Sequence, residues 1–272
     1  MGEPEPARAA GRRFSPFGAC LLLVSACGPA LYPEPVHPIT DPDVLIARLD
    51  ARRRALGSLS AVARVETYSR RGVAKGRVTI LADAAGRLRV DAWTPSDDLV
   101  AALRADPDGF LYYERGANEC VVGPSCPGNV GRLIPIGLDV RDACAALFGF
   151  PRVLPATTAW GVSFDRREGA YRLESGTARG SQRIWVRDDG VPVRAEYVEA
   201  GRVAWRLDAG DFKTAGGEPW PHRLHFATAR DDTDVTVRYR SLDPRAHIAP
   251  EDWAFDCPQG VPVRSLPCEG GS

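Results

Sequence analysis

The sequence predicts a mainly β protein with short helices, in which an antiparallel sheet has one apolar and one solvated face. Residues 87–93 alternate strictly, with Leu88, Val90 and Ala92 on one face and charged residues on the other. Residues 191–197 and 202–208 repeat this pattern. Turn-forming pairs such as Asp189-Gly190 separate the alternating runs, as expected for hairpin connections.

Residues 1–26 predict an export signal. Arg12 and Arg13 precede a short apolar run that is too brief to span a bilayer. Small residues at 25 and 26 lead into Cys27, so residues 21–27 resemble the lipobox of bacterial lipoproteins. That resemblance implies cleavage before Cys27 and acylation of its sulfur. The alternative is an ordinary signal that is cut elsewhere and leaves Cys27 unmodified.

Charge and length narrow the possible partners. The 272 residues contain 35 basic and 35 acidic side chains, and loss of residues 1–26 removes three arginines and two glutamates. The mature chain therefore has a net charge near −1, which argues against nucleic acid as a partner. No later run approaches 18 apolar residues, so the lipid on Cys27 is the expected membrane attachment.

The segment after the signal predicts a tether and then a helix. Five prolines among residues 28–43 predict a stiff spacer, residues 27–43, that holds the folded part off the bilayer. A helix is expected over 42–57, with Asp41 as its N-cap, Pro42 in its first position and Gly57 at its end.

The main domain is expected to span residues 44–256, followed by a C-terminal tail at 257–272. We expect ten or eleven strands among the following segments, some of which can merge: 60–69, 73–82, 87–94, 98–105, 109–114, 118–122, 160–166, 170–176, 182–187, 191–199, 202–212, 221–229 and 233–240. Residues 127–150 interrupt the strands, and Asp139 could cap a helix that runs to Phe148. This helix either covers the open mouth of a curved sheet or fills the core as a crossover.

The cysteines predict disulfides, because an exported protein meets an oxidising compartment. Cys120 and Cys126 enclose a turn-rich loop, and Cys257 and Cys268 bracket a segment rich in proline and glycine. We predict a bridge within each pair, although sequence alone does not fix connectivity. Cys144 is then left as a small buried apolar residue or, alternatively, a reactive thiol.

The order of these elements resembles the LolA/LolB superfamily, and most closely its LolB-like outer-membrane lipoproteins. The resemblance covers residues 44–256 and is strongest over 60–151. It is carried by Gly76-Arg-Val-Thr-Ile-Leu-Ala-Asp, by Arg87-Leu-Arg-Val-Asp-Ala-Trp-Thr-Pro and by Leu147-Phe-Gly-Phe-Pro.

The resemblance implies an unclosed antiparallel β half-barrel with an N-terminal helix, a helical lid and an apolar interior that holds acyl chains. Burial of each methylene contributes about 0.8 kcal/mol, so such a site needs no catalytic motif and no cofactor. The implied cavity wall, whose members could equally be plain core, consists of Val78, Ile80, Leu88, Val90, Leu99, Leu103, Ile134, Leu138, Leu147 and Phe148.

One loop departs from the family pattern. Where LolB-like proteins have an exposed leucine in a membrane-facing loop, this chain has Pro95, Ser96 and Asp97. A polar loop does not enter hydrocarbon, which argues against delivery of lipoproteins into the membrane and leaves binding open.

Other site chemistry is not expected. His222 and His225 are three positions apart on a predicted strand, so they face opposite sides and cannot share a metal. The sequence has no nucleophile elbow and no phosphate-binding glycine loop. An enzyme that uses Cys144 or a histidine is the weakest hypothesis.

We therefore expect a monomeric, non-enzymatic, lipid-anchored protein on the periplasmic face of the outer membrane, without metal or cofactor, that binds acyl chains or lipidated proteins. Outer-membrane sorting follows by family analogy, since Gly28 and not aspartate comes after Cys27. The alternative is a structural envelope lipoprotein whose half-barrel is filled by side chains and which acts through protein contacts.

Overall fold

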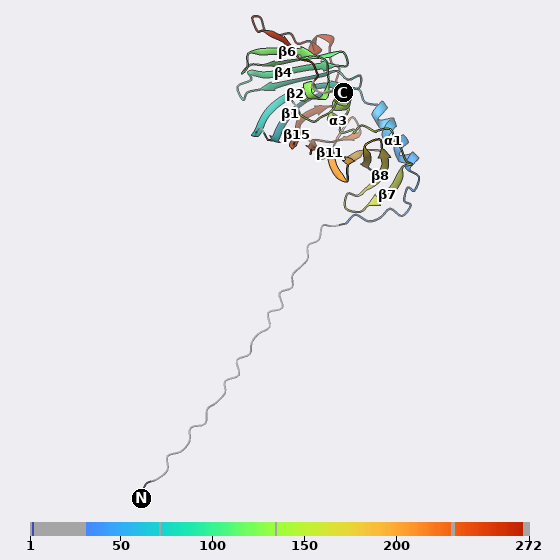
Figure 1. The fold of residues 1–272 in the computed structure, drawn as a ribbon. Helices are drawn as coiled ribbons and strands as arrows, with labels where there is room; N and C mark the ends of the chain where they lie inside the picture. The colour runs from blue at the N-terminus through green and yellow to red at the C-terminus, as the bar shows by residue number, and fades with distance from the viewer. Residues whose placement is uncertain (1, 3–30, 71, 134, 230–231, 269–272) are drawn as a thin grey trace. The chain divides into compact units, whose positions relative to one another are not determined.

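The computed structural model describes residues 2, 31–70, 72–133, 135–229 and 232–268. The predicted signal, Cys27 and Ile134 lie outside the described residues. Within them, one large unclosed sheet is the main element and curls around a short helix, α3 (Figure 1). The predicted fold class, mainly β with an unclosed antiparallel sheet, is confirmed.

The strands follow one another mostly as hairpins. In the described part of the chain, fourteen strands form the large sheet in the order β16-β6-β5-β4-β3-β2-β1-β15-β14-β11-β10-β9-β8-β7. Their bounds are β1 Ser58–Ser69, β2 Gly72–Asp83, β3 Leu88–Trp93, β4 Leu99–Asp106, β5 Gly109–Glu114, β6 Glu119–Gly123, β7 Gly161–Asp165, β8 Ala170–Thr177, β9 Gly180–Val186, β10 Pro192–Glu199, β11 Arg202–Gly210, β14 Arg223–Thr228, β15 Thr233–Asp243 and β16 Val263–Ser265. Strands β12 (Lys213–Ala215) and β13 (Glu218–Trp220) form a separate hairpin.

Each predicted strand segment matches a strand of the sheet. The pairing of β1 with β15 joins the first six strands to the later ones. The alternation places one row of side chains on the concave face, where Val78 and Ile80 of β2 and Leu224 and Phe226 of β14 are fully buried. The strand prediction missed β12, β13 and β16, which have only three residues each.

The N-terminal helix starts where the sequence indicates and ends earlier. Helix α1 spans Pro42–Arg54, and the Asp41 side chain accepts a hydrogen bond from the Asp43 amide at 3.0 Å. The prediction of Gly57 as its end was wrong. Ala55 caps the helix, because the chain must leave it early enough to bury Leu56 and to start β1 at Ser58.

The described part of the predicted tether is bound to the domain. It does not form a spacer that holds the domain off the bilayer. The amide of Tyr32 donates to the carbonyl of Arg166 at 2.8 Å, beyond the end of β7. The amide of Ile39 donates to the hydroxyl of Tyr171 at 3.2 Å, and the Ile39 side chain packs against the core. Residues 31–41 thus belong structurally to the body.

The predicted disulfide pairing was also wrong. The bridges are Cys120–Cys257 and Cys126–Cys268, with sequence separations of 137 and 142 residues. The described part of the predicted tail runs back to the sheet, where β16 pairs in parallel with β6. This return brings the late cysteines to the early ones, so each bridge links the two regions and neither closes a local loop.

A C-terminal strap, residues 244–268, covers the outer face of the first strands. It contains the 3₁₀ helix η1 (Pro250–Trp253). Arg89 of β3 donates to the carbonyls of Asp252 and Ala254 at 2.8 and 2.7 Å. The guanidinium of Arg87 lies 4.5 Å from the centre of the Trp253 ring. The strap therefore replaces solvent on this part of the outer face.

Candidate functional site

The concave face of the sheet is the candidate site that the sequence indicated. Eight of its ten predicted wall residues lie in one contiguous buried cluster: Val78, Ile80, Leu88, Val90, Leu103, Leu138, Leu147 and Phe148. Leu99, the first residue of β4, is half-buried and lies outside that cluster. Ile134 lies outside the described residues. The structure thus buries eight of these residues together, while ligand binding by them stays a prediction.

A lid segment, residues 135–154, lies across this face and contains α3 (Val140–Leu147). Asp139 caps α3 as expected, since its side chain accepts from the Asp142 amide at 3.0 Å. Helix α3 packs on β2 and β4, and every residue from Asp142 to Phe150 is buried. Figure 1 shows α3 inside the curve of the sheet. The helix therefore plugs the concavity in this state.

Two aromatic side chains of the concave face bind the lid backbone. The indole Nε1 of Trp205 donates to the carbonyl of Ile136 at 2.9 Å. The hydroxyl of Tyr239 donates to the carbonyl of Leu147, at the last residue of α3, at 2.6 Å. Complete burial raises the pKa of Tyr239, so its hydroxyl stays protonated and remains a donor. These contacts satisfy two carbonyls that the interior would otherwise leave unpaired.

A second pair of side chains binds the end of the lid segment. The fully buried Gln182 donates from Nε2 to the carbonyl of Arg152 at 2.5 Å and accepts from the Leu154 amide at 2.9 Å. The hydroxyl of Tyr197 donates to the same Arg152 carbonyl at 2.8 Å. We call Gln182, Tyr197, Trp205 and Tyr239 the latch residues. Their contacts hold the lid by its backbone groups. These contacts therefore do not depend on which side chains the lid carries.

An ion cluster holds the lid to α1. Arg152 lies 3.0 Å and Arg53 3.5 Å from the carboxylate of Asp142. Burial raises the pKa of Asp142, and the neighbouring Asp139 carboxylate adds to this rise. The two arginines oppose both effects, so Asp142 depends on them to stay charged.

The pocket beside the end of α3 is small. It is a void of about 30 Å³ next to α1, beside Phe148, Phe150, Phe212 and Trp220. That volume holds about one water molecule, far less than an acyl chain needs. A larger, open hollow of about 560 Å³ lies at the ends of β1, β11, β14 and β15, where Tyr68, Val203 and Thr228 line it. Because α3 is buried against β2 and β4, a binding role for the part of the concave face beneath it requires movement of the lid.

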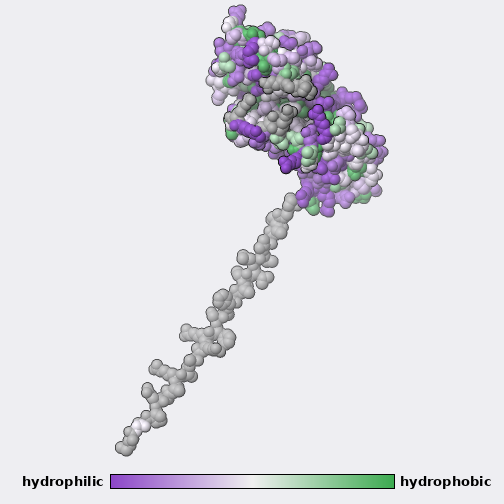
Figure 2. Space-filling view, in the orientation of Figure 1, coloured by the Kyte–Doolittle hydropathy of each residue, from purple (hydrophilic) through white to green (hydrophobic). Residues whose placement is uncertain are grey.

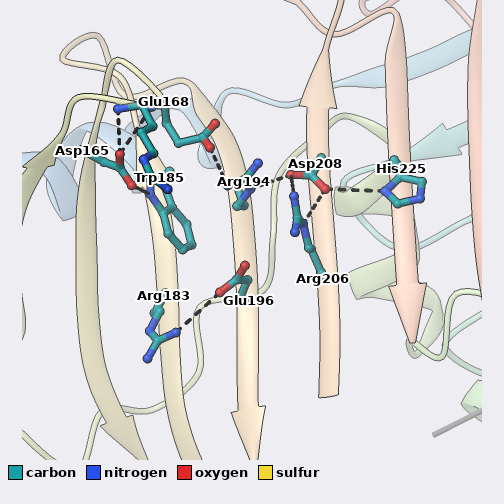
Figure 3. A network of polar contacts seen from close by, with 10 residues as sticks. Asp165, Glu168, Arg183, Trp185, Arg194, Glu196, Arg206, Asp208 and His225 are labelled. Atoms are coloured by element: carbon teal, nitrogen blue, oxygen red, sulfur yellow. Dashed lines mark hydrogen bonds and ion pairs between the residues drawn. The ribbon is translucent and has the colours of Figure 1, made fainter. Parts of the chain in front are cut away.

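The outer face of the later strands carries a polar network (Figure 3). Arg194 of β10 bridges Glu168 and Asp208, each at 2.6 Å. His225 of β14 lies 3.5 Å from Asp208 and 2.7 Å from Asp234. These cross-strand charge pairs stabilise the alignment of β10, β11, β14 and β15.

Electrostatics within this network favour charged groups. Burial opposes ionisation of Asp208, but hydrogen bonds from His225, Arg206 and Arg194 outweigh it and lower the pKa of that carboxyl. The hydrogen bond to Asp208 raises the pKa of His225, although burial opposes the rise. At the edge, Trp185 donates from Nε1 to Asp165 at 2.8 Å.

Cys144 and the predicted histidine pair lie in different environments. Cys144 is buried, burial raises its pKa to about 12, and its thiol donates to the carbonyl of Arg87 at 3.3 Å. Among the described residues, no group of three histidine, cysteine or acidic side chains could hold a metal ion. His225 lies on the solvated face of β14, while His222 precedes that strand.

The loop of Pro95, Ser96 and Asp97 is exposed and polar. The hydroxyl of Ser96 donates to Asp98 at 2.9 Å, and Asp97 pairs with Arg77 of β2. These contacts satisfy the loop within the protein, consistent with its predicted failure to enter a bilayer. No helix in the described ranges has the length and apolar character needed to cross one.

Solved structures with the same fold identify the architecture. A domain assigned to outer membrane lipoprotein sorting from Vibrio parahaemolyticus superposes with a TM-score of 0.55 at 11% identity, covering 77% of this chain and 94% of its own. A DUF1329 family protein from Desulfovibrio piger gives 0.54 at 12% identity, covering 78% and 95%. A LolA superfamily protein from Nitrosomonas europaea gives 0.50 at 13% identity, covering 80% and 99%.

These likenesses establish a LolA/LolB-like fold for this chain, as its element order indicated. No protein-family model matches the sequence, and no curated protein matches it either. The latch residues are the part of the site that sequence reasoning missed. A signal was present, since Gln182 shares a strand face with apolar residues, where a polar side chain needs a buried partner.

Proposed function

We propose that this protein binds acyl chains, free or attached to lipidated proteins, in the concave face of its half-barrel after the lid segment moves aside. The observation that carries the proposal is that an apolar concave face is covered by one short segment of the chain. The plug is held by the four latch residues and the Asp142 ion cluster, and the chain on either side of it is continuous.

The energetics require a long acyl chain for such an exchange. Release of the lid loses the latch contacts, about 1 kcal/mol each, and re-exposes buried lid side chains such as Val140, Leu147 and Phe148, about 1.5–3 kcal/mol each. An acyl chain that replaces the lid would cover the same apolar residues, and each of its methylenes gains about 0.8 kcal/mol on leaving water. Loading therefore comes near balance only when the chain buries on the order of fifteen methylenes or more.

Uptake of a fluorescent fatty acid by residues 28–272, produced without lipid, tests the proposal. Leu103 faces the concavity and Val100 of the same strand is exposed on the other face. We expect Leu103→Asn to weaken uptake at least tenfold and Val100→Asn to leave it unchanged, with thermal unfolding used to show that both variants are folded. Equal uptake by the two variants would contradict a concave site.

A second candidate function is that of a structural envelope lipoprotein that acts through protein contacts. The observation that favours it is the tight interior, where eight of the predicted wall residues are buried and the void beside Phe148 is about 30 Å³. This candidate predicts no uptake by the parent protein or by variants with a loosened lid.

The proposed location is the periplasmic face of the outer membrane, with the protein attached by acyl groups on Cys27 and acting as a monomer. The lipobox at residues 21–27 supports the attachment. Mass spectrometry of the protein made with its own signal tests it, because acylation adds the mass of the lipid to a chain that starts at Cys27.

A further inference from the structure

The chain just after the proposed lipid site is fixed to one corner of the body. The amide of Tyr32 donates to the Arg166 carbonyl at 2.8 Å, and Arg166 returns a hydrogen bond from Nε to the Tyr32 carbonyl at 3.2 Å. The Tyr32 ring lies over Gly169, where a Cβ would come within 2.7–2.9 Å of three ring carbons. Glycine at 169, with φ +62°, is therefore required for this contact.

The segment that follows is anchored as well. Ile39 binds the Tyr171 hydroxyl and packs against the core, and Asp41 caps α1. Leu45 and Leu49 of α1 are fully buried. From Tyr32 onward the chain thus moves with the body and cannot act as a free spacer.

This corner exposes an unusual share of apolar side chains. Nine large apolar residues are exposed in the part of the chain that the structure describes, and three of them lie within residues 31–36. The exposed fractions are 50% for Leu31, 55% for Tyr32 and 88% for Val36. On the visible face of the body, hydrophobic residues are scattered among hydrophilic ones (Figure 2). Apolar residues gathered at one exposed place indicate a surface that meets a partner.

We propose that residues 31–36 lie in the interface of a phospholipid bilayer and hold the β7–β8 corner of the half-barrel against the membrane. This inference rests on the proposed acylation of Cys27. Only five residue steps separate Cys27 from Tyr32, and a fully extended chain covers about 18 Å in that distance. Lipid on Cys27 therefore confines the Tyr32 corner to the neighbourhood of the bilayer surface.

The charges of the segment select the kind of membrane contact. Residues 31–44 contain Glu34, Asp41 and Asp43 and no lysine or arginine, so any attraction to anionic headgroups at this corner comes from Arg166 and Arg167 of the adjoining turn and not from the segment itself. The segment is held by contacts of its apolar side chains with lipid and by the tyrosine ring, a side chain typical of the headgroup region.

The polar loop of Pro95, Ser96 and Asp97 leaves the sheet at the opposite strand ends. Neighbouring strands in this part of the sheet are antiparallel, so their directions alternate along the sheet order. The β7–β8 turn therefore lies at one end of the strands and the β3–β4 turn at the other. Eight positions in the sheet order separate β3 from β8. In the proposed orientation this loop faces the aqueous compartment, which fits its charges.

A fluorescent label tests the orientation in the full-length lipidated protein. The variants Val36→Cys and Ser96→Cys each add one exposed thiol, because the four outer cysteines form disulfides and Cys144 is buried. Each labelled protein is reconstituted in phosphatidylcholine vesicles that carry a nitroxide quencher near the headgroups. We expect quenching at position 36 to be at least about three times that at position 96.

The outcomes separate the two proposals. An acylated mass for the protein together with equal quenching at the two positions, or stronger quenching at position 96, would overturn the orientation and leave the lipid anchor intact. A mass without acyl groups would overturn the anchor and, with it, the orientation.

Discussion

Replacement of Tyr239 by phenylalanine removes the hydroxyl that binds α3 and little else. The ring is buried and would keep its packing, while the Leu147 carbonyl loses its donor at 2.6 Å. An unpaired carbonyl in the interior costs about 1–3 kcal/mol, and water reaches it once the lid moves away. The population of lid-open molecules should therefore rise roughly 5- to 150-fold.

Two measured quantities should change in opposite directions in Tyr239→Phe: stability should fall and affinity for fatty acid should rise. Urea unfolding should show a loss of about 1–3 kcal/mol in the free energy of unfolding. Apparent affinity for a fluorescent fatty acid should increase, because a larger fraction of molecules is competent to bind. Tyr68→Phe is the matched control, since Tyr68 is exposed near the end of β1 and its substitution should change neither quantity.

Either of two results would refute this reasoning. Unchanged stability in Tyr239→Phe would mean that the hydroxyl does not hold the lid. Reduced stability with unchanged fatty-acid affinity would mean that lid release does not control access to the concave face.

The remaining predictions concern cysteines and the outer face. Cys257→Ser, which breaks a bridge closing about 140 residues, should lower stability by about 2–5 kcal/mol, and peptide mapping should recover the Cys120–Cys257 and Cys126–Cys268 pairs rather than local ones. Cys144 should resist alkylation at neutral pH until denaturant is added, because its pKa is about 12. His225→Gln should lower the melting temperature more near pH 5 than near pH 9: the pKa of His225 is raised by Asp208, so its stabilising contribution is complete below its ordinary pKa and is lost as pH rises through the folded one.

Local features were predictable because they depend on neighbouring residues. Alternation located the strands, and the caps at Asp41 and Asp139 were found from residue types next to proline or an apolar run. The concave faces of β2 and β3 followed from the same alternation, which put Val78, Ile80, Leu88 and Val90 on one side. The mainly β class followed from this alternation, whereas the unclosed half-barrel was what the resemblance to the LolA/LolB superfamily implied.

Features that depend on distant parts of the chain were not predictable. The cysteine pairs seemed local because each encloses a turn-rich segment, but the strap brings residue 257 to residue 120. Prolines indicated a spacer at residues 28–43, yet Tyr32 finds Gly169, which only the folded hairpin presents. The latches join side chains of β9, β10, β11 and β15 to lid carbonyls, and a carbonyl carries no sequence signal.

Native mass spectrometry of residues 28–272, before and after solvent extraction, tests the central claim most directly. This form lacks Cys27, so any acyl group that it carries is bound noncovalently and is not a covalent lipid anchor. We predict a stoichiometric acyl-bearing ligand that extraction removes and that added fatty acid restores. A single ligand-free mass, unchanged by fatty acid or by an acylated peptide, would contradict acyl-chain binding and favour a structural lipoprotein with a filled half-barrel.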